Sequence, residues 1–554
     1  MMAFFIENMA PIMFASLVVV LLLGYPAAFS LAAVGLIYAL VGIELGEFSP
    51  DFLQALPERV YGVMNNDTLL AIPFFTFMGL VLERSGMAED LLDTIGQLFG
   101  TVRGGLAYAV IFVGALLAAT TGVVAASVIS MGLISLPIML RYGYDRRVAS
   151  GVIAASGTLA QIIPPSLVLI VMADQLGRSV GDMYEGAFIP GLVLSGLYAG
   201  YVFLVTLVYP KATPGLPAEA VGFREDNGNR GLISLAFLAI ASGFFAWYAM
   251  RGSQSHGADY VVLSMFYGIV FAFGIAVVNW LLDKATGYRF LSRMAQQTTF
   301  VMVPPLFLIF LVLGTIFIGL ATPTEGGAMG AVGALILGGM KRRLSWDLVR
   351  QAVESTAKLS AFVVFILLGA RVFSLTFYGV SGHIWVEHML TSLPGGHVGF
   401  LIFVNIFVFV LAFFLDFFEL AFIIIPLLGP AAEKLGIDLI WFGVILGVNM
   451  QTSFMHPPFG FALFYLRSVA PRDPYNDRVT GLRMEPVTTG QIYWGAVPFV
   501  VIQVIMVALV ITFPAMVMHY KKGQSTVDPN TVKIDVPQLD MPSLNFDSTP
   551  PNFK

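Results

Sequence analysis

Long apolar runs separated by short polar segments dominate the chain from residue 11 to residue 520. A run of about 20 apolar residues can cross the ~30 Å hydrocarbon core of a bilayer as a helix. Two such runs, at 232–250 and 260–282, are apolar on nearly every face, whereas a membrane β-barrel would show alternating segments of about 10 residues. The pattern predicts an all-α polytopic membrane protein.

Composition narrows the function classes further. The chain is 58% hydrophobic and 11% charged, whereas soluble domains carry about 25% charged residues, so a soluble enzyme is excluded. There is no cysteine, which excludes disulfides and thiolate metal sites. A net charge of -5 argues against a nucleic-acid partner.

The two ends of the chain read differently from its middle. Residues 1–10 carry no basic stretch before the first apolar run, so we expect no cleaved signal peptide and a first helix that stays as an anchor. Residues 523–554 contain five prolines among Ser, Asp, Asn and Thr. That composition predicts a disordered soluble tail.

An internal repeat is visible in the order of short landmarks. The offsets between the two copies drift only from 291 to 309 residues, which favours duplication over chance. The landmarks that return are Gly104-Gly105 as Gly395-Gly396, Pro137 as Pro430, Gly143 as Gly436, Asp145 as Asp438, Pro164-Pro165 as Pro457-Pro458, and Tyr184 as Tyr493.

Loop charges suggest how the two copies are oriented. The loop at 44–51 is acidic, whereas its counterpart at 341–343 is Lys-Arg-Arg. Lys and Arg near helix ends favour the cytoplasm, so equivalent loops of opposite bias predict inverted topology. We therefore divide the chain into a first inverted repeat at 1–210, a connector with two inserted helices at 211–303, a second repeat at 304–522 and the tail at 523–554.

Several catalytic motifs are absent from the sequence. It has no G-x-x-x-x-G-K-[ST] phosphate loop and no H-E-x-x-H zinc motif. Catalysis therefore has no obvious place in the chain, and we expect a protein that is not an enzyme.

Each repeat contains an apolar span with helix breakers at matching places. In the first, Ser156-Gly157-Thr158 and Pro164-Pro165-Ser166 interrupt the span 149–173, and 449–453 followed by His456-Pro457-Pro458 is the counterpart. Proline removes backbone donors and frees carbonyls, which can coordinate Na⁺, while the resumed half-helix favours a carboxylate at its N-terminus. The alternative is a proline kink that serves packing alone.

A short-segment hairpin precedes each broken span. Segments 107–119 and 127–140 flank Thr120-Thr121-Gly122, and segments 401–415 and 420–428 flank a tip that begins at Asp416. Asp416 and Glu419 share one face if both are helical. Two buried carboxylates need a cation or a proton, or else structural hydrogen bonds to neighbouring backbone amides.

Three further polar positions have simpler interpretations. His456 could bond a substrate carboxylate, or it could be a packing group beside the kink. Glu325 lies near a helix start, where a capping role is the simpler one, and 65–67 reads as a cluster of N-cap residues.

At these residues the chain resembles the large membrane subunit of tripartite ATP-independent periplasmic (TRAP) transporters. The resemblance covers residues 10 to about 520, and its length and inserted spans look most like the mannitol/chloroaromatic or 2-oxo-acid branch. It rests on LAIPFFTFMG at 70–79, GTLAQIIPPS at 157–166, ATPTE at 321–325, FLDFFE at 414–419 and IYWGAVP at 492–498.

The resemblance implies an elevator-type secondary transporter of the bacterial inner membrane, driven by a Na⁺ gradient. A periplasmic substrate-binding protein would deliver an organic acid anion, and a separate small membrane subunit would be a second partner. No organic cofactor is implied, and Na⁺ is the coupling ion.

The resemblance also assigns positions to the ligands. Na⁺ would be held in two sites, one at Thr120, Thr121, Gly122, Ser156, Gly157 and Thr158, the other at Asp416, Glu419, Asn449, Gln451 and Thr452. Substrate would lie between the tips near Gln161, Pro165, Ser166, His456 and Pro458. Family first tips often read Ser-Gly-Ser-Ser, whereas this one reads Thr-Thr-Gly-Val-Val, so backbone carbonyls would replace side-chain hydroxyls there.

Three other functions stay open at this point. A proton-coupled carrier of organic anions that works without partners would use Asp416 and Glu419. A membrane-embedded serine hydrolase would pair Ser156 with His456. A channel would pass substrate with no saturable, partner-dependent step, and the hairpin repeats count against it.

Overall fold

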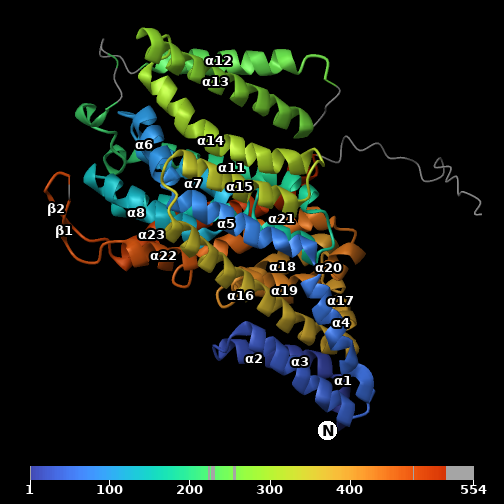
Figure 1. Ribbon diagram of the computed structural model, residues 1–554. Helices are drawn as coiled ribbons and strands as arrows, with labels where there is room; N and C mark the ends of the chain where they lie inside the picture. Colours follow the sequence, from blue (N-terminus) through green and yellow to red (C-terminus); the bar gives the residue numbers. More distant parts are fainter. Residues whose placement is uncertain (1, 223–224, 226–230, 254–257, 478, 520–554) are drawn as a thin grey trace, which may run out of the picture.

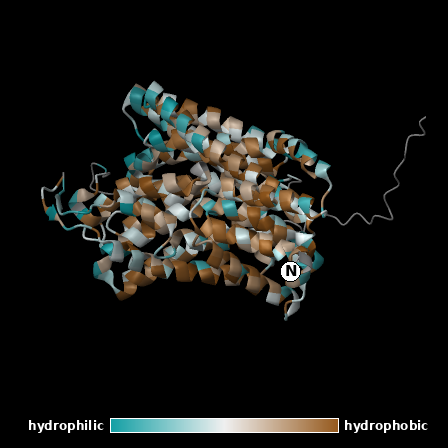
Figure 2. Ribbon diagram, turned by 90° about the horizontal axis from the view of Figure 1, so that it is seen from below, coloured by the Kyte–Doolittle hydropathy of each residue, from teal (hydrophilic) through white to brown (hydrophobic). Residues whose placement is uncertain are grey.

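The computed structural model describes residues 2–222, 225, 231–253, 258–477 and 479–519. Those residues are almost entirely helical (Figure 1), and eight helices are long and apolar enough to cross a membrane, or up to ten if two bent pairs each count as one span. Hydrophobic residues predominate along the helices (Figure 2). The prediction of an all-α polytopic chain is confirmed, and the predicted tail at 523–554 lies outside the described residues.

The N-terminal helices pack against the long helix α16 (Trp346–Gly379) along one edge of the molecule (Figure 1). Glycines allow this contact, because a Cβ on Gly369 would lie 2.4 Å from the Ala28 carbonyl oxygen. Thr376 donates a hydrogen bond of 2.8 Å to the Gly35 carbonyl across the same seam. The N-terminal elements are α1 (Met2–Glu7), α2 (Met9–Leu22), α3 (Ala27–Glu44), η1 (Pro50–Ala55), α4 (Leu56–Met64) and η2 (Asp67–Leu70).

A second close helix pair is formed by α5 (Ala71–Arg84) and α15 (Pro323–Met340). Thr322 and Glu325 form a reciprocal capping box at the start of α15, so the capping role expected of Glu325 is confirmed. Asn66 caps η2 by accepting from the Thr68 N–H. Neighbouring elements are α6 (Met87–Phe99) and α14 (Arg293–Phe317), while α17 (Gly382–Thr391) packs against α16 and the second hairpin.

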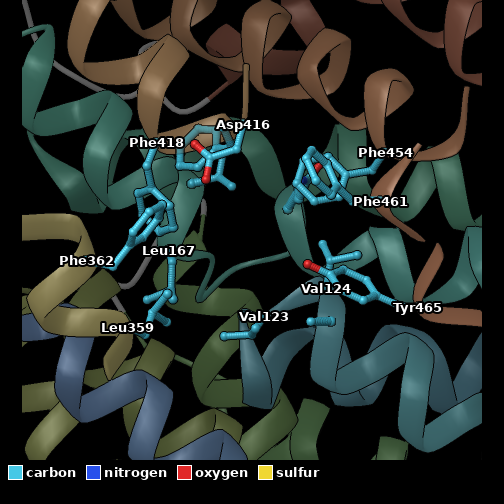
Figure 3. Close-up of a pocket in the computed structure, with 15 residues that line it drawn as sticks. Val123, Val124, Leu167, Leu359, Phe362, Asp416, Phe418, Phe454, Phe461 and Tyr465 are labelled. Carbon is cyan, nitrogen blue, oxygen red and sulfur yellow. The ribbon is translucent and has the colours of Figure 1, made fainter. Parts of the chain in front are cut away.

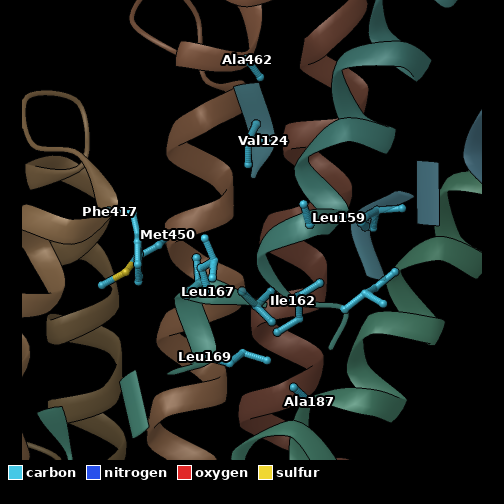
Figure 4. Packing of buried hydrophobic residues seen from close by; sticks show 14 of the residues in the cluster. Val124, Leu159, Ile162, Leu167, Leu169, Ala187, Phe417, Met450 and Ala462 are labelled. Carbon is cyan, nitrogen blue, oxygen red and sulfur yellow. The ribbon is translucent and has the colours of Figure 1, made fainter. Parts of the chain in front are cut away.

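The centre of the molecule consists of two helical hairpins and two broken helices. The first hairpin is α7 (Gly105–Thr121) with α8 (Val124–Arg141), and the first broken helix is α9 (Arg146–Thr158), η3 (Leu159–Gln161) and α10 (Leu167–Gln175). The second set is α18 (Gly396–Leu411), α19 (Phe417–Ile423), α20 (Ile425–Lys434), α21 (Leu439–Met455) and α22 (Phe461–Val469). Figure 4 shows the apolar side chains that fill the space where these elements and α11 (Val180–Val208) meet.

The two inserted helices form an outer layer beside α14 (Figure 1). They are α12 (Leu232–Ala249) and α13 (Ala258–Thr286), and only 11% of the apolar window of each is buried. Asn279 of α13 fixes the turn that follows, since its side-chain oxygen accepts from the N–H groups of Phe290 and Leu291 at 2.9 Å. The sequence predicted both helices.

A polar loop follows α22 and contains the short strands β1 (Tyr475–Asn476) and β2 (Arg483–Met484). Arg141, at the end of α8, pairs with Asp477 at 2.9 Å and holds this loop against the first hairpin. The guanidinium lowers the pKa of the Asp477 carboxyl below its usual range. The remaining elements are η4 (Pro210–Ala212), η5 (Ala218–Ala220), α23 (Thr489–Thr512) and α24 (Ala515–Met518).

Repeat landmarks have matching structural roles in the two halves. Gly104 and Gly395 are left-handed residues that precede α7 and α18, and Asp145 and Asp438 cap α9 and α21 through the second and third N–H groups. Both double prolines contain a cis peptide bond. The glycine and aspartate positions agree with the predicted duplication, while the repeat itself, its boundaries and its inverted orientation stay predictions.

Candidate functional site

The first hairpin tip is built by backbone rather than by charged side chains. Gly122 joins α7 to α8 in the left-handed region, at φ 59°. A Cβ there would lie 3.2 Å from Leu167 Cγ and 3.3 Å from the Pro165 carbonyl oxygen, so the tip touches the break of the first broken helix. Thr120 and Thr121 end α7, and their side chains lie outside the described residues.

The second tip carries two carboxylates that cap their own helix. Asp416 Oδ1 accepts from the Glu419 N–H at 2.9 Å, and Glu419 Oε2 accepts from the Asp416 N–H at 2.9 Å. This capping box satisfies two helix-end donors. The premise that both residues are helical is wrong: Asp416 is the extended N-cap residue, and α19 begins at Phe417.

The first broken helix is interrupted once, across 159–166, so the prediction of a separate interruption at 156–158 is wrong. Ser156 and Thr158 lie in the last turn of α9, where their hydroxyls donate to the carbonyls of Val152 and Ala155 at 2.7 and 2.8 Å. Gly157 packs against α8, because a Cβ there would lie 2.3 Å from Val128 Cγ2. These bonds and this contact are compatible with a continuous helix.

The second broken helix is interrupted at 456–460, after the polar turn at 449–453. Asn449 and Thr452 lie within α21, where the Asn449 amide donates to the Asn405 carbonyl at 2.8 Å and the Thr452 hydroxyl donates to the Asn449 carbonyl at 2.6 Å. Asn449 therefore joins the broken helix to the first arm of the second hairpin.

Both tips border a single cavity of about 320 Å³ (Figure 3). Gly122 and Asp416 come from the tips, Gln161 from the first break, and Leu359 and Phe362 from α16. Further lining residues are Val123, Val124, Ala125, Leu167, Val168, Phe417, Phe418, Phe454, Phe461 and Tyr465.

Four helices begin at this cavity. Their first residues all line it: Val124 of α8, Leu167 of α10, Phe417 of α19 and Phe461 of α22. Asp416 caps α19, whereas no side chain caps α8, α10 or α22 among the described residues. Uncapped N–H groups and the positive ends of the helix dipoles favour an anion.

The predicted substrate residues do not all meet at the cavity. Gln161 lines it, is 2% exposed, and its Oε1 atom has no hydrogen-bond partner in the described part of the chain. Ser166 is fully buried just before α10 and donates to the Gln161 carbonyl at 2.6 Å, while Pro165 contacts the first tip through its carbonyl.

The other two predicted substrate residues lie away from the lining. The His456 ring packs edge-on against Phe413, with centroids 4.5 Å apart, and Pro458 is exposed. Neither borders the cavity between the tips. The packing interpretation of His456 therefore describes its contacts in this conformation.

Two predicted Na⁺ ligands, Thr158 and Gln451, bond to each other instead of pointing to a tip. Gln451 Nε2 donates to Thr158 Oγ1 at 3.1 Å, and Gln503 Nε2 lies 3.4 Å from the same oxygen. Gln503 also donates to the Tyr198 hydroxyl at 2.8 Å. All four side chains are fully buried, and we call this group the polar bridge, since it joins α9, α11, α21 and α23.

Sequence reasoning missed several of these residues. Gln503 had a signal, because it is a lone amide within the apolar run 492–512, and buried polar residues in spans are often functional. Tyr465 had a weaker one, because it follows the second break. Leu359 and Phe362 had none, since nothing distinguishes them from other apolar residues of their helix.

A family model described as "Tripartite ATP-independent periplasmic transporter, DctM component" matches residues 14–516. The match covers most of the chain and includes both hairpins and both broken helices. It confirms the resemblance seen in the sequence, while the branch suggested there stays a prediction.

Individual relatives agree with the family match. The chain is 27% identical over 469 residues to the C4-dicarboxylate TRAP transporter large permease protein DctM of Pseudomonas aeruginosa, covering 84% of this chain and 89% of the relative. It is 23% identical over 506 residues to the sialic acid TRAP transporter permease protein SiaT of Haemophilus influenzae, covering 90% and 66%. The solved Alcanivorax borkumensis YdaH transporter aligns with a TM-score of 0.46 at 15% identity, covering 84% of this chain and 90% of that one.

The family match and the candidate spans together define the class of protein. The family model and both relatives reported above carry the names of TRAP transporter components. The chain belongs to the DctM component family of tripartite ATP-independent periplasmic transporters and is a multi-pass protein of the bacterial inner membrane.

Proposed function

We propose that this chain imports an organic acid anion, delivered by a periplasmic binding protein, by Na⁺-coupled transport with elevator-type alternating access. The observation that carries the proposal is the cavity at which four helices begin and both hairpin tips meet. Relatives named for C4-dicarboxylate and sialic acid transport favour a carboxylate as substrate.

Uncapped helix starts support the anion half of the proposal. The N-termini of α8, α10 and α22 offer backbone N–H groups that a carboxylate can accept. The unpartnered Gln161 Oε1 offers an acceptor for a substrate hydroxyl beside them. A cavity of about 320 Å³ suits a small organic acid.

The second tip supports the cation half. In the capping box, Asp416 and Glu419 each have one carboxylate oxygen bonded to a backbone N–H. Asp416 also lines the cavity. A buried carboxylate in a membrane needs a positive partner, and Na⁺ supplies it together with backbone carbonyls of the tip. Binding of Na⁺ would neutralise Asp416 and so favour the substrate carboxylate.

Two kinds of contact suggest which part moves. The seams α3–α16 and α5–α15 are close-packed, since added Cβ atoms on Gly369 or Gly330 would lie 2.4 Å from neighbouring atoms. By contrast, α16 meets the tips through a cavity lined by Leu359 and Phe362. Hairpins and broken helices would therefore move as one body past these seams, with a small membrane subunit completing the static part.

The competing functions make different use of the same residues. A proton-coupled carrier would need protonated Asp416 and Glu419 in place of Na⁺. A hydrolase would need Ser156 beside His456. Ser156 is instead fully buried and its hydroxyl donates to the Val152 carbonyl, while the His456 ring packs on Phe413. A channel would need no saturable step.

Uptake into proteoliposomes tests the proposal. The chain is reconstituted with its small-subunit partner and offered labelled C4-dicarboxylates and 2-oxo acids, with and without an inward Na⁺ gradient and the cognate binding protein. We expect saturable uptake that requires both the inward Na⁺ gradient and the binding protein. Uptake that follows a pH gradient and ignores Na⁺ would contradict Na⁺ coupling, and uptake without the binding protein would contradict the tripartite scheme.

A further inference from the structure

A second, smaller cavity of about 250 Å³ lies between α4, α10, α16 and the second hairpin. Two arginines line it, Arg59 of α4 and Arg371 of α16, together with the polar side chains of Gln175, Ser374 and Tyr378. Phe422 and Pro426 of the hairpin also line it. The cavity thus combines two fixed positive charges with a wall that belongs to the proposed moving part.

Neither arginine has an acidic partner among the residues that the structure describes. No hydrogen bond or ion pair joins Arg59 or Arg371 to another group there, whereas other arginines of the chain, such as Arg141, Arg178 and Arg350, do pair with carboxylates. The nearby Asp174 carboxylate is already bonded by Asn66 and Gln175, at 2.7 Å each. Arg59 is exposed and Arg371 is half-buried, so both guanidinium groups keep donors free for an anion that enters the cavity.

Loop charges place this cavity on the periplasmic side. Helix α16 begins at Trp346, just after the basic loop 341–343, and α9 begins at Arg146 in another basic loop. Basic loops favour the cytoplasm. Arg371, near the end of α16, and Gln175, at the end of α10, therefore lie toward the opposite face, where α4, α17 and α20 gather in Figure 1.

Aromatic rings lie between this cavity and the one between the tips. Phe418 lines the inner cavity and Phe422 the outer one, and their rings are 6.4 Å apart and stacked. The Phe362 and Phe418 rings meet edge-on with centroids 6.3 Å apart, and both residues are labelled in Figure 3. An anion in the outer cavity would therefore be one layer of rings from the inner cavity.

We propose that Arg59 and Arg371 form an outer anion site that receives the carboxylate of the organic acid after its release by the binding protein and before it passes the rings of Phe362, Phe418 and Phe422. The proposal rests on the proposed function, since it names the path by which that substrate reaches the inner cavity. Guanidinium groups suit this role because they bind carboxylates with two parallel hydrogen bonds.

Cavity size favours a free small acid over a larger anionic partner. A volume of about 250 Å³ admits a compound of four to six carbons. The fixed charges also attract anions over several ångströms, which raises the rate of capture.

Direct binding is the first test. Labelled succinate is equilibrated with the purified transporter and its small subunit in Na⁺-free buffer, with succinamide as a neutral competitor of the same size. We expect the Kd to rise about tenfold in Arg59→Gln and in Arg371→Gln, with partial recovery in Arg371→Lys. Arg350→Gln is the matched control, because Arg350 lies on the same helix, exposed and outside the cavity.

Transport kinetics are the second test. Because the site captures substrate before translocation, both variants should raise the apparent KM about tenfold and leave Vmax unchanged. Higher ionic strength should raise the wild-type KM and change the double variant's KM far less. A fall in Vmax with KM unchanged would overturn the proposal.

Other outcomes are equally decisive. Succinate binding that is the same in the wild type and the double variant would overturn the outer anion site. Loss of co-purified anionic phospholipid, or of binding-protein docking, with succinate binding unchanged would overturn it too, by assigning the arginines to a headgroup or to a protein surface.

The two proposals can fail separately. Wild-type uptake that ignores Na⁺ would defeat the proposed function, yet the Na⁺-free binding assay would still report on the arginines. Conversely, Na⁺-dependent uptake with unaltered kinetics in the double variant would leave the proposed function standing and remove the outer anion site.

Discussion

The two hairpin tips occupy equivalent places around one cavity but are built differently. At the first, Gly122 turns the chain and the following helix starts without a side-chain cap among the described residues. At the second, Asp416 and Glu419 close a capping box over the start of α19. One tip thus presents backbone donors, whereas the other presents a carboxylate.

This difference suggests that the tips of the two halves bind different ligands. Free N–H groups attract an anion, whereas a carboxylate at the same depth attracts a cation. The first tip would then serve mainly the substrate and the second mainly the coupling ion. Duplication gives two similar frames, and a few substitutions at the tips are enough to give them opposite electrostatic preferences.

Replacing Asp416 tests the cation role of the second tip and should have the largest effect. Asn caps helices as well as Asp, so Asp416→Asn keeps the cap and removes the charge. We expect the half-saturating Na⁺ concentration for uptake to rise about a hundredfold, with little change in thermal stability. The measurement is Na⁺-dependent uptake beside thermal unfolding in detergent.

Glu419→Gln is the matched comparison for that variant. Its side chain can still accept the Asp416 N–H, and the residue does not line the cavity, so a smaller change is expected. Wild-type Na⁺ dependence in Asp416→Asn would show that the carboxylate serves only as a cap.

Gly122→Ala probes the first tip through its backbone. The left-handed conformation costs a non-glycine residue about 1–2 kcal/mol, and the new Cβ would press on Leu167 and the Pro165 carbonyl at 3.2 and 3.3 Å. We expect Vmax to fall about tenfold, because about 1.4 kcal/mol added to the activation free energy lowers a rate by a factor of ten. Gly200→Ala is the control, because nothing lies within 4 Å of a Cβ there. Equal activity in both variants would rule out a tight first tip.

Thr158→Val tests whether the polar bridge joins the halves. It removes the acceptor of the Gln451 amide, so a fully buried donor loses its partner and the free energy of unfolding should fall by about 1–3 kcal/mol. Thr512→Val is the control, since the exposed Thr512 hydroxyl donates to the Ala508 and Leu509 carbonyls of its own helix, at 2.8 and 3.2 Å. The free energies are measured by chemical denaturation. Equal losses of unfolding free energy in the two variants would mean that the polar bridge contributes nothing beyond the local bond.

Asp477→Asn gives the smallest expected effect, because it lies in a loop outside the cavity. Arg141 lowers the pKa of Asp477 below its ordinary value of 3.8, so the folded state favours the ionised form. Its stabilisation is complete above about pH 4 and is lost as pH falls toward the folded pKa. The difference in Tm between wild type and variant should be constant from pH 8 to 5 and shrink below pH 4. A difference that grows on acidification would contradict this sign.

Much of the fold could be predicted from the sequence. The hairpins, both broken spans, the inserted pair and the caps at Glu325 and Asn66 follow from apolar length, Gly and Pro positions and capping residues, which act within a few residues. The extent of the breaks was mispredicted at 156–158, because back-bonded hydroxyls let a Ser-Gly-Thr turn stay helical.

What the sequence alone determined is the set of local elements: which segments are apolar enough to span, and where each helix begins or breaks. Only the tertiary structure decided that Thr158 bonds Gln451 rather than facing a tip, that His456 packs on Phe413, and that Arg59 and Arg371 share a cavity. The physical reason is that capping and hydropathy are set by neighbours in the chain. The partner of a buried side chain is set instead by which helices pack together across hundreds of residues.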